Sequence, residues 1–198
     1  LKIHDSRIRL IRHQSNQGLI NTLNHGIAEA RHDLIARHDQ DDVAYPKRLQ
    51  YQVDLMDRRQ EIGVCGTGAY MLENGQRLAK ILFPESDLMI RWALPFYCPL
   101  IHPSVMYRRS IVRLVSGYST STEAHYSEDY DLWCKLIPHT KFHNIQRPLM
   151  DLRKHRANMT IAKKDYHIRQ TTYITKKYVD GVLKRNVPIE LIRWLCGF

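Results

Sequence analysis

The sequence contains no run of about 18 apolar residues, the length that a helix needs to cross a bilayer, so no membrane span is expected. It also contains no C-x-x-C pair, no internal repeat and no low-complexity stretch. Its four cysteines are widely spaced, at Cys65, Cys98, Cys134 and Cys196. This spacing argues against a disulfide framework or a zinc site and indicates reduced thiols in a cytosolic protein.

What the sequence does contain is enough apolar material for one sizeable core. Of the 198 residues, 43% are hydrophobic, which predicts one domain with an appendage rather than two domains. The formal net charge of +10 is concentrated towards the C-terminus: residues 147–198 hold 12 Lys and Arg against 4 Asp and Glu, whereas residues 1–146 hold 18 against 16. This basic segment indicates either an anionic partner or a solvated helix. Nucleic acid is disfavoured as that partner, because the body is nearly neutral and no recognised nucleic-acid-binding motif occurs.

Hydrophobic periodicity predicts alternating strands and helices in the first half of the chain. In chain order we expect a strand at 8–12, a helix at 19–31, a strand at 33–39, a helix from Pro46, a hairpin of 62–73 and 77–83 turning at Asn74-Gly75, and a helix at 85–97. Asn-Gly between alternating apolar segments is a strong hairpin signal. The order strand–helix–strand–helix–hairpin indicates a mixed α/β sheet.

The second half is expected to be mostly helical. We predict a strand at 102–110, a helix at 127–136 capped by Ser127, an extended segment at 142–155, a long helix from about 161 and a last apolar turn after Pro188. Trp92 and Trp133 are expected in the core, whereas Trp194 is either an interfacial anchor or packed on the domain. Arg108 and Arg109 are expected to be solvated.

Three aspartates occur within four positions of "ARHDQDDVAYPKRL", residues 36–49. Asp39 ends an expected strand, and Asp41 and Asp42 lie on the loop that leads to Pro46. In an open α/β sheet, ligands bind beyond the carboxyl ends of the strands, where one or two carboxylates and a phosphate can hold Mg²⁺ or Mn²⁺. The alternative is a cap and turn ahead of the next helix. Spacing alone leaves both interpretations open.

An ordered set of motifs in the chain resembles the family 2 glycosyltransferases of the GT-A fold. The set is N-x-G, L-N-x-G-I, D-x-D-D and P-x-R-L, which here are Asn16/Gly18, Leu23/Asn24/Gly26/Ile27, Asp39/Asp41/Asp42 and Pro46/Arg48/Leu49. The resemblance implies an α/β fold with a mixed, mostly parallel sheet flanked by helices. It also implies a GT-A domain at residues 1–160, without the N-terminal nucleotide-binding strands, and a basic helical extension at residues 161–198.

The same resemblance implies a donor site around the aspartates. Asp39 would contact the sugar nucleotide, Asp41 would bind the divalent cation, and Asp42 would cap or support the loop. Asn24 and His102 are assigned to the donor site as well. For His102, an imidazole satisfied by backbone hydrogen bonds is an equal alternative.

A second acidic pair lies in "YSEDYDLW", which resembles the E-D motif of this family. Asp129 is the candidate base for the acceptor hydroxyl, and Glu128 would orient it or contact the acceptor. The alternative is that both acids stabilise the start of a helix through its dipole, by roughly 0.3–1 kcal/mol. "RKHRANMT" resembles the H-x-x-N-x-S/T element, so His155 could complete the metal shell or touch the diphosphate.

The function implied by the resemblance is inverting transfer of a sugar from a nucleotide-diphosphate donor to a saccharide or lipid-linked acceptor in cell-surface polysaccharide synthesis. Mn²⁺ or Mg²⁺ would be the cofactor. The alternatives are a truncated, non-catalytic scaffold and a nucleic-acid-binding module that uses the basic segment. We expect a cytoplasmic protein, with peripheral contact of the basic segment on the anionic inner membrane face as a further possibility.

Overall fold

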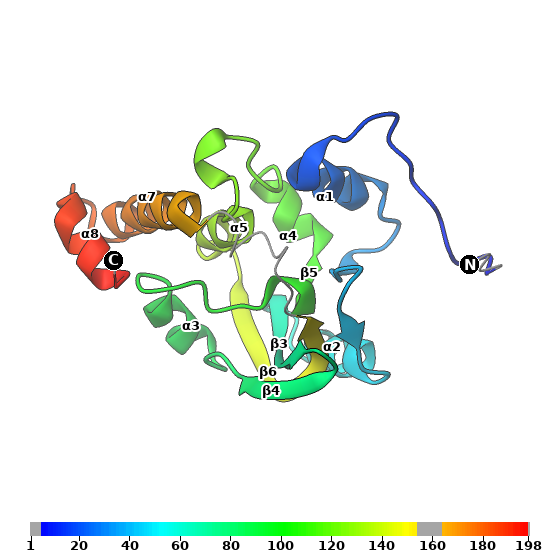
Figure 1. The fold of residues 1–198 in the computed structure, drawn as a ribbon. Coiled ribbons are helices and arrows are strands. Elements are labelled where there is room, and N and C mark those ends of the chain that lie inside the picture. Colours follow the sequence, from blue (N-terminus) through cyan, green and yellow to red (C-terminus); the bar gives the residue numbers. More distant parts are fainter. Residues whose placement is uncertain (1–4, 154–163, 198) are drawn as a thin grey trace.

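A six-stranded mixed sheet forms the centre of the protein, and helices cover it (Figure 1). The computed structural model describes residues 5–153 and 164–197. The strands are β1 (Leu34–Ala36), β2 (Val43–Ala44), β3 (Ile62–Glu73), β4 (Gln76–Ile81), β5 (Met106–Arg108) and β6 (Lys141–Arg153). They are arranged in the order β1-β5-β3-β6-β2, and β4 also pairs with β3.

The expected mixed sheet is confirmed, but the expectation that it is mostly parallel is wrong for the residues described. β3 and β6 pair in parallel, whereas β1/β5, β3/β5, β2/β6 and β3/β4 are antiparallel. A two-residue turn joins β3 to β4 and makes that pair antiparallel. The other antiparallel partners are far apart in the sequence, so the path of the longer connections sets their direction.

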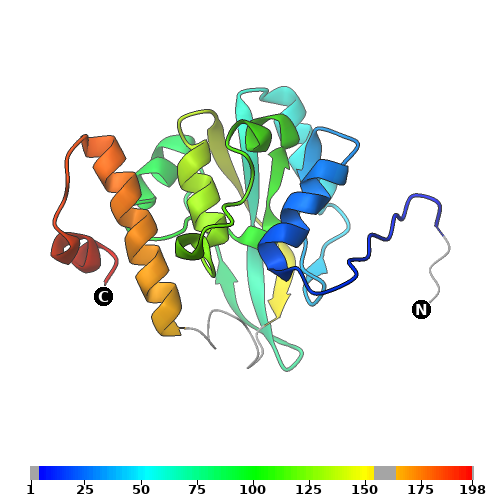
Figure 2. The same cartoon turned by 90° about the horizontal axis from the view of Figure 1, so that it is seen from above.

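The predicted helices occur in the expected order, several with shorter bounds, and one further helix that was not predicted lies at Arg109–Leu114. The helices are α1 (Gly18–Glu29), α2 (Arg48–Arg58), α3 (Asp87–Ala93), α4 (Arg109–Leu114), α5 (Glu128–Leu136), α7 (Lys164–Leu183) and α8 (Ile189–Leu195), with short 3-10 turns at η1 (His102–Ser104) and η2 (Thr122–Ala124). None of these helices combines the length and apolar character that crossing a bilayer requires. Helices α1, α5 and α7 lie side by side over one face of the sheet (Figure 2).

Strand β3 is buried on both faces, which explains its nearly continuous run of small and apolar residues. Val64 belongs to the main core together with Trp133 of α5. The next residue, Cys65, points to the opposite face and packs with Met56 of α2. The strand ends at Asn74 and Gly75, whose φ values of 51° and 80° place both in the left-handed region. The predicted hairpin turn is therefore confirmed.

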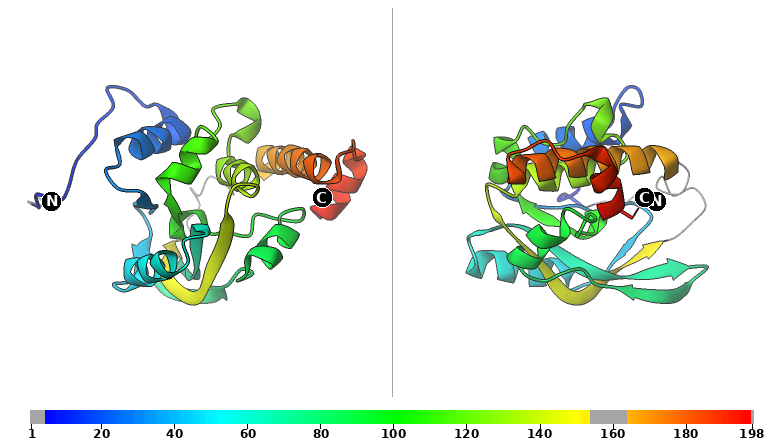
Figure 3. Two further views of the ribbon diagram at one scale, coloured as in Figure 1. Left: turned by 180° about the vertical axis from the view of Figure 1, so that it is seen from behind. Right: turned by 90° about the vertical axis from the view of Figure 1, so that its left-hand side faces the viewer.

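The predicted strand at residues 8–12 is wrong. The segment is not a strand, and Ile8 and Leu10 are 55% and 72% exposed. It extends away from the body of the protein (Figure 3). An alternating pattern forms a strand only when a neighbouring strand accepts its backbone hydrogen bonds, and no described residue provides one here.

Three side chains differ from their expected burial. Trp92 is 66% exposed on α3 and stacks on Phe96 rather than entering the core. Arg108 and Arg109 are half-buried instead of solvated. The Arg108 guanidinium donates to the carbonyls of Ile62 and Met56 at 3.1 and 2.8 Å, and Arg109 donates to the carbonyl of Ala30.

Helix α7 packs against α5. Ile174 of α7 belongs to the same core cluster as Trp133, and the hydroxyls of Tyr130 and Thr175 are 2.9 Å apart. Val179, Val187 and Ile192 form a smaller cluster between α7 and α8. The division into a domain at 1–160 and a tail at 161–198 stays a prediction.

The two tryptophans, Trp133 and Trp92, provide a matched test of the core. Trp133 is fully buried, so Trp133→Ala should lower the free energy of unfolding by about 3–5 kcal/mol, because it removes a large buried side chain and leaves a cavity. Trp92→Ala should change the same quantity by less than about 0.5 kcal/mol. Urea unfolding monitored by circular dichroism measures both. Equal losses in the two variants would contradict the assignment of the core.

Candidate active site

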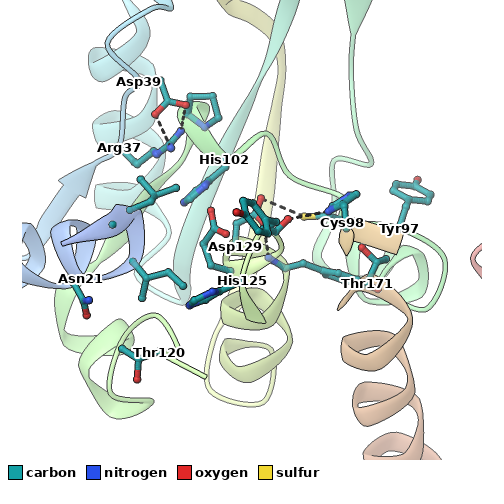
Figure 4. Close-up of a pocket in the computed structure, with 18 of the residues that line it drawn as sticks. Asn21, Arg37, Asp39, Tyr97, Cys98, His102, Thr120, His125, Asp129 and Thr171 are labelled. Carbon is teal, nitrogen blue, oxygen red and sulfur yellow. Dashed lines mark hydrogen bonds and ion pairs between the residues drawn. The ribbon is translucent and has the colours of Figure 1, made fainter. Parts of the chain in front are cut away.

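A cavity of about 860 Å³ opens beside the carboxyl end of β1 (Figure 4). Its walls come from segments that are distant in the sequence: the start of α1, the loop after β1, the 96–98 loop, the start of α5 and the side of α7. The acidic residues that line it are Asp39, Asp41, Glu128 and Asp129. The structure therefore brings both acidic motifs to one cleft, although almost ninety residues separate them in the chain.

Arg37 is the central cation of this cleft. Its side chain is 6% exposed, and its guanidinium grips both carboxylate oxygens of Asp39, with N–O distances of 2.6 and 2.7 Å (Figure 4). Such a two-point contact fixes the direction of the carboxylate as well as its charge. A buried cation without a partner would cost several kcal/mol, so this pair also explains how Arg37 can be buried.

Arg48, the arginine of the P-x-R-L motif, fixes the backbone at the start of the loop that carries the aspartates. It is buried, and its guanidinium donates to the carbonyl of Arg37 at 2.5 Å and contacts Nδ1 of His38 at 3.2 Å. It also donates to the side-chain oxygen of Gln52 at 3.2 Å. Burial lowers the pKa of Arg48 to about 10, so its side chain stays protonated at neutral pH. Arg48 thus holds the loop that carries the aspartates.

The three aspartates provide carboxylate oxygens that lie within 4.8 Å of one another. Asp39 and Asp41 line the cavity. Asp42 instead accepts a hydrogen bond from the backbone N–H of Arg153 at 3.0 Å, which ties the loop to β6. Burial raises the pKa of Asp42, and the charges of Asp41 and Asp39 raise it further. An all-oxygen set with crowded negative charge fits a hard divalent cation such as Mg²⁺ or Mn²⁺.

Glu128 and Asp129 form the other side of the cleft at the first turn of α5. Glu128 is 8% exposed, whereas Asp129 is half-buried. Burial, together with the neighbouring charge of Asp129, raises the pKa of Glu128 to about 7. Burial also raises the pKa of Asp129, while the backbone N–H of Tyr130 and the charge of Arg37 act in the opposite direction. Two acids of raised pKa facing one cleft are typical of sites for proton transfer.

His102 lies in the cleft wall close to this pair. Its ring and the two carboxylates provide atoms within 4.8 Å of one another. The Nε2 atom is 2.8 Å from the hydroxyl of Tyr118, so the imidazole has a partner, although that partner is a side chain rather than the backbone. Burial and the charge of Arg37 lower the pKa of His102 well below its usual range, and the ring is neutral at physiological pH.

Two residues assigned to the site are placed differently. Asn24 does not line the cavity, because its carboxamide is used elsewhere: it donates to the carbonyl of Tyr118 and accepts from the N–H of the same residue, each at 2.9 Å. Asn24 thus holds the turn that carries Tyr118, and its assignment to donor binding stays a prediction. His155 lies outside the described residues.

The sequence analysis missed Arg37, Cys98, His167 and Thr171, which also line the cavity. Arg37 carries a sequence signal in retrospect, because a charged residue directly after a short apolar strand needs a partner of opposite charge where it is buried, and Asp39 follows two positions later. The thiol of Cys98 is 3.9 Å from a carboxylate oxygen of Asp129. His167 and Thr171 belong to α7, whose approach to α5 depends on tertiary packing and has no local signature.

Comparison with known proteins identifies the family of the chain. Residues 1–115 match the model of the family described as "Glycosyl transferase family 2". The chain belongs to this family. EpsE of Bacillus subtilis (strain 168) is 33% identical over 76% of this chain and 54% of its own length. The "O-antigen biosynthesis glycosyltransferase WbnJ" of Escherichia coli is 30% identical over 76% of this chain and 59% of its own length. The chain thus spans somewhat more than half the length of these two relatives.

Solved structures share the fold. Staphylococcus aureus TarS 1-349, crystallised with UDP-GlcNAc, superposes with a TM-score of 0.61 and 12% identity, covering 90% of this chain and 50% of that one. The mannosyltransferase PcManGT from Pyrobaculum calidifontis, in complex with GDP-Man and Mn²⁺, gives a TM-score of 0.52 and 12% identity, covering 94% and 50%. The fold of this family 2 chain is that of the GT-A glycosyltransferases.

The raised pKa of Glu128 predicts a pH-dependent stability. Its ordinary value of 4.5 holds in the unfolded chain, so between pH 4.5 and about 7 the folded protein binds more protons than the unfolded one. The free energy of unfolding must therefore fall as the pH rises through this window. Glu128→Gln removes the penalty and should be more stable than the parent at about pH 8, by on the order of 1–3 kcal/mol.

Urea unfolding of both proteins from about pH 4 to about pH 8 measures this difference. Glu190→Gln is the matched control, because Glu190 also lies in the first turn of a helix but is exposed. Parallel stability curves for the parent and Glu128→Gln would show that the pKa of Glu128 is not raised.

Proposed function

We propose that the complete protein transfers a sugar from a nucleotide-diphosphate donor to a hydroxyl of a saccharide or lipid-linked acceptor, with inversion at the sugar carbon. The observation that carries this proposal is the shared cavity: Asp39 and Asp41 line one side, and Glu128 and Asp129 line the other. Two structures that share the fold, TarS 1-349 and PcManGT, were solved in complex with UDP-GlcNAc and with GDP-Man. This supports a sugar nucleotide as the donor, and the name of WbnJ supports a role in polysaccharide synthesis.

In this proposal the aspartate loop holds the donor. Asp39, oriented by Arg37, contacts the sugar nucleotide, and Asp41 binds the divalent cation. When bound, the cation supplies positive charge beside the departing diphosphate. Asp42 supports the loop through its bond to the backbone of β6. The neutral ring of His102 can accept or donate a hydrogen bond to substrate without adding charge.

Asp129 is the proposed base. One of its oxygens accepts a hydrogen bond from the N–H of Tyr130 at 2.9 Å, which fixes the carboxylate, and the residue remains half-exposed at the cavity wall. It removes the proton of the acceptor hydroxyl as that oxygen attacks the sugar carbon from the face opposite the diphosphate. A raised pKa suits this task, because a base works best with a pKa close to the working pH. Glu128, more deeply buried, orients the acceptor.

Two substitutions test these roles. Asp129→Asn removes the base and should lower kcat by about 10²–10⁴-fold, with little effect on donor binding. Asp41→Asn should instead weaken Mn²⁺-dependent donor binding, because one oxygen ligand of the cation is lost. Transfer by the complete protein, with a panel of sugar nucleotides, and calorimetric donor titration with and without metal separate the two effects.

Asp57→Asn is the control, because Asp57 is exposed on α2 and does not line the cavity. Undiminished sugar transfer by both Asp41→Asn and Asp129→Asn would contradict the assignment of the active site. Unchanged donor affinity after addition of EDTA would remove the cation from the proposal.

We also propose that the protein is cytoplasmic and that its C-terminal helices contact the anionic inner face of a membrane. Besides two tyrosines of α7, the large apolar side chains exposed on α7 and α8 are Val182, Leu183, Leu191 and Trp194, and Trp194 is 77% exposed. The basic residues nearest to them in the chain are Lys184, Arg185 and Arg193. Exposed apolar side chains on these two helices, with basic side chains on α8 and on the loop between the helices, suit an anionic lipid surface, and a lipid-linked acceptor would be presented there.

Flotation with liposomes tests this contact. The complete protein should float with vesicles that contain anionic lipid and remain below with neutral ones. Arg185→Gln should weaken binding by about 5-fold, since a basic side chain near an anionic surface contributes about 1 kcal/mol. Leu114→Ser, which changes an exposed apolar residue on α4, is the control. Equal flotation with neutral and anionic vesicles would argue against the electrostatic contact.

A further inference from the structure

Helix α7 reaches the cleft at the point where the acidic pair begins. His167 and Thr171 line the same cavity as Glu128 and Asp129, and both lie one above the other on α7, four residues apart. Nδ1 of His167 is 2.8 Å from the carbonyl oxygen of Tyr126 and 2.9 Å from the hydroxyl of Ser127. The imidazole is therefore bonded to the two residues that immediately precede the acidic pair.

The backbone at these two residues is unusual. Tyr126 has φ = 64°, in the left-handed region that a bulky residue rarely adopts. Ser127 occupies the N-cap position of α5, yet its side chain makes no capping bond to the helix. Its hydroxyl is directed to His167 and, at 3.4 Å, to the hydroxyl of Thr171. Strained backbone persists where surrounding contacts hold it, and it concentrates at functional sites.

Chemistry determines which nitrogen of His167 carries the proton. A backbone carbonyl can only accept a hydrogen bond, so the 2.8 Å contact with Tyr126 requires a proton on Nδ1. The Ser127 hydroxyl then accepts from the same N–H and can donate to Thr171. In the neutral ring, Nε2 is left without a proton. The contact with α7 thus uses one defined tautomer.

We propose that His167 is a positioning residue: its Nδ1–H holds the Tyr126–Ser127 backbone so that Glu128 and Asp129 face the cleft. Helix α7 is then part of the active site rather than an accessory. This inference rests on the proposed glycosyl transfer for its kinetic readout. Its structural readout, the tautomer of His167, is independent of any activity.

The kinetic test compares two amides. Asn places its amide nitrogen close to the position of Nδ1, whereas Gln reaches towards the position of Nε2. His167→Asn should therefore keep kcat within about 3-fold of the parent, and His167→Gln should lower kcat by about 100-fold, the loss that a small misplacement of reacting groups can cause. The Kd of the donor, measured by calorimetry, should be unchanged in both. A large loss of kcat in His167→Asn, with kcat retained in His167→Gln, would overturn the proposal and would indicate that Nε2 binds the substrate. Unchanged kcat in both variants would overturn it as well.

The structural test uses the complete parent protein labelled with ¹⁵N-histidine. The resonances of the neutral ring of His167, assigned by their loss in His167→Asn, should show a proton on Nδ1 and none on Nε2. A proton on Nε2 alone would overturn the proposal whether or not the protein transfers sugar. If the parent transfers no sugar while the Nδ1–H tautomer is found, the proposed function fails and the positioning contact stands.

Discussion

The buried guanidinium of Arg37 is the interaction on which the rest of the cleft depends. Four carboxylates line this cavity. The repulsion among their negative charges would favour protonation of some of these carboxylates, or their separation. Arg37 neutralises one of them by direct contact with Asp39, and its charge lowers the pKa values of Glu128 and Asp129 against the effect of burial. Burial lowers the pKa of His102, and the charge of Arg37 lowers it further. One side chain thereby acts on charged or titratable groups of three separate segments, the aspartate loop, η1 and α5.

The scaffold explains how those segments reach Arg37. Arg37 directly follows strand β1, and the pairing of β1 with β5 places the following loop beside η1 and His102. Arg48 binds the carbonyl of Arg37 from the first turn of α2, so a helix that lies outside the cavity still determines the direction of the aspartate loop. Helix α5 brings its first turn to the opposite side. Most residues of the site lie at or just beyond the ends of strands and helices, which is the usual arrangement in α/β sheets.

Local signals predicted much of this fold. The apolar spacing of α1, the Asn74-Gly75 turn and the acidic start of α5 are properties of short segments, and each appears at the expected place. Longer-range features were missed or misjudged. Residues 8–12 alternate like a strand but have no pairing partner among the described residues, and the pairing directions of the sheet depend on chain path. Arg37 was overlooked because its importance comes from what surrounds it, not from its spacing.

The bond between Asn24 and the turn at Tyr118 links α1 to the cleft wall. Asn24 grips the backbone of Tyr118 at both its N–H and its carbonyl, and the hydroxyl of Tyr118 meets His102. Gly117 makes this possible, because a Cβ there would collide with the Asn24 side chain. Chimaeras that exchange the first helix between members of the family must therefore exchange the glycine-containing turn with it, because the side chain from the helix and the backbone of the turn pack directly against each other.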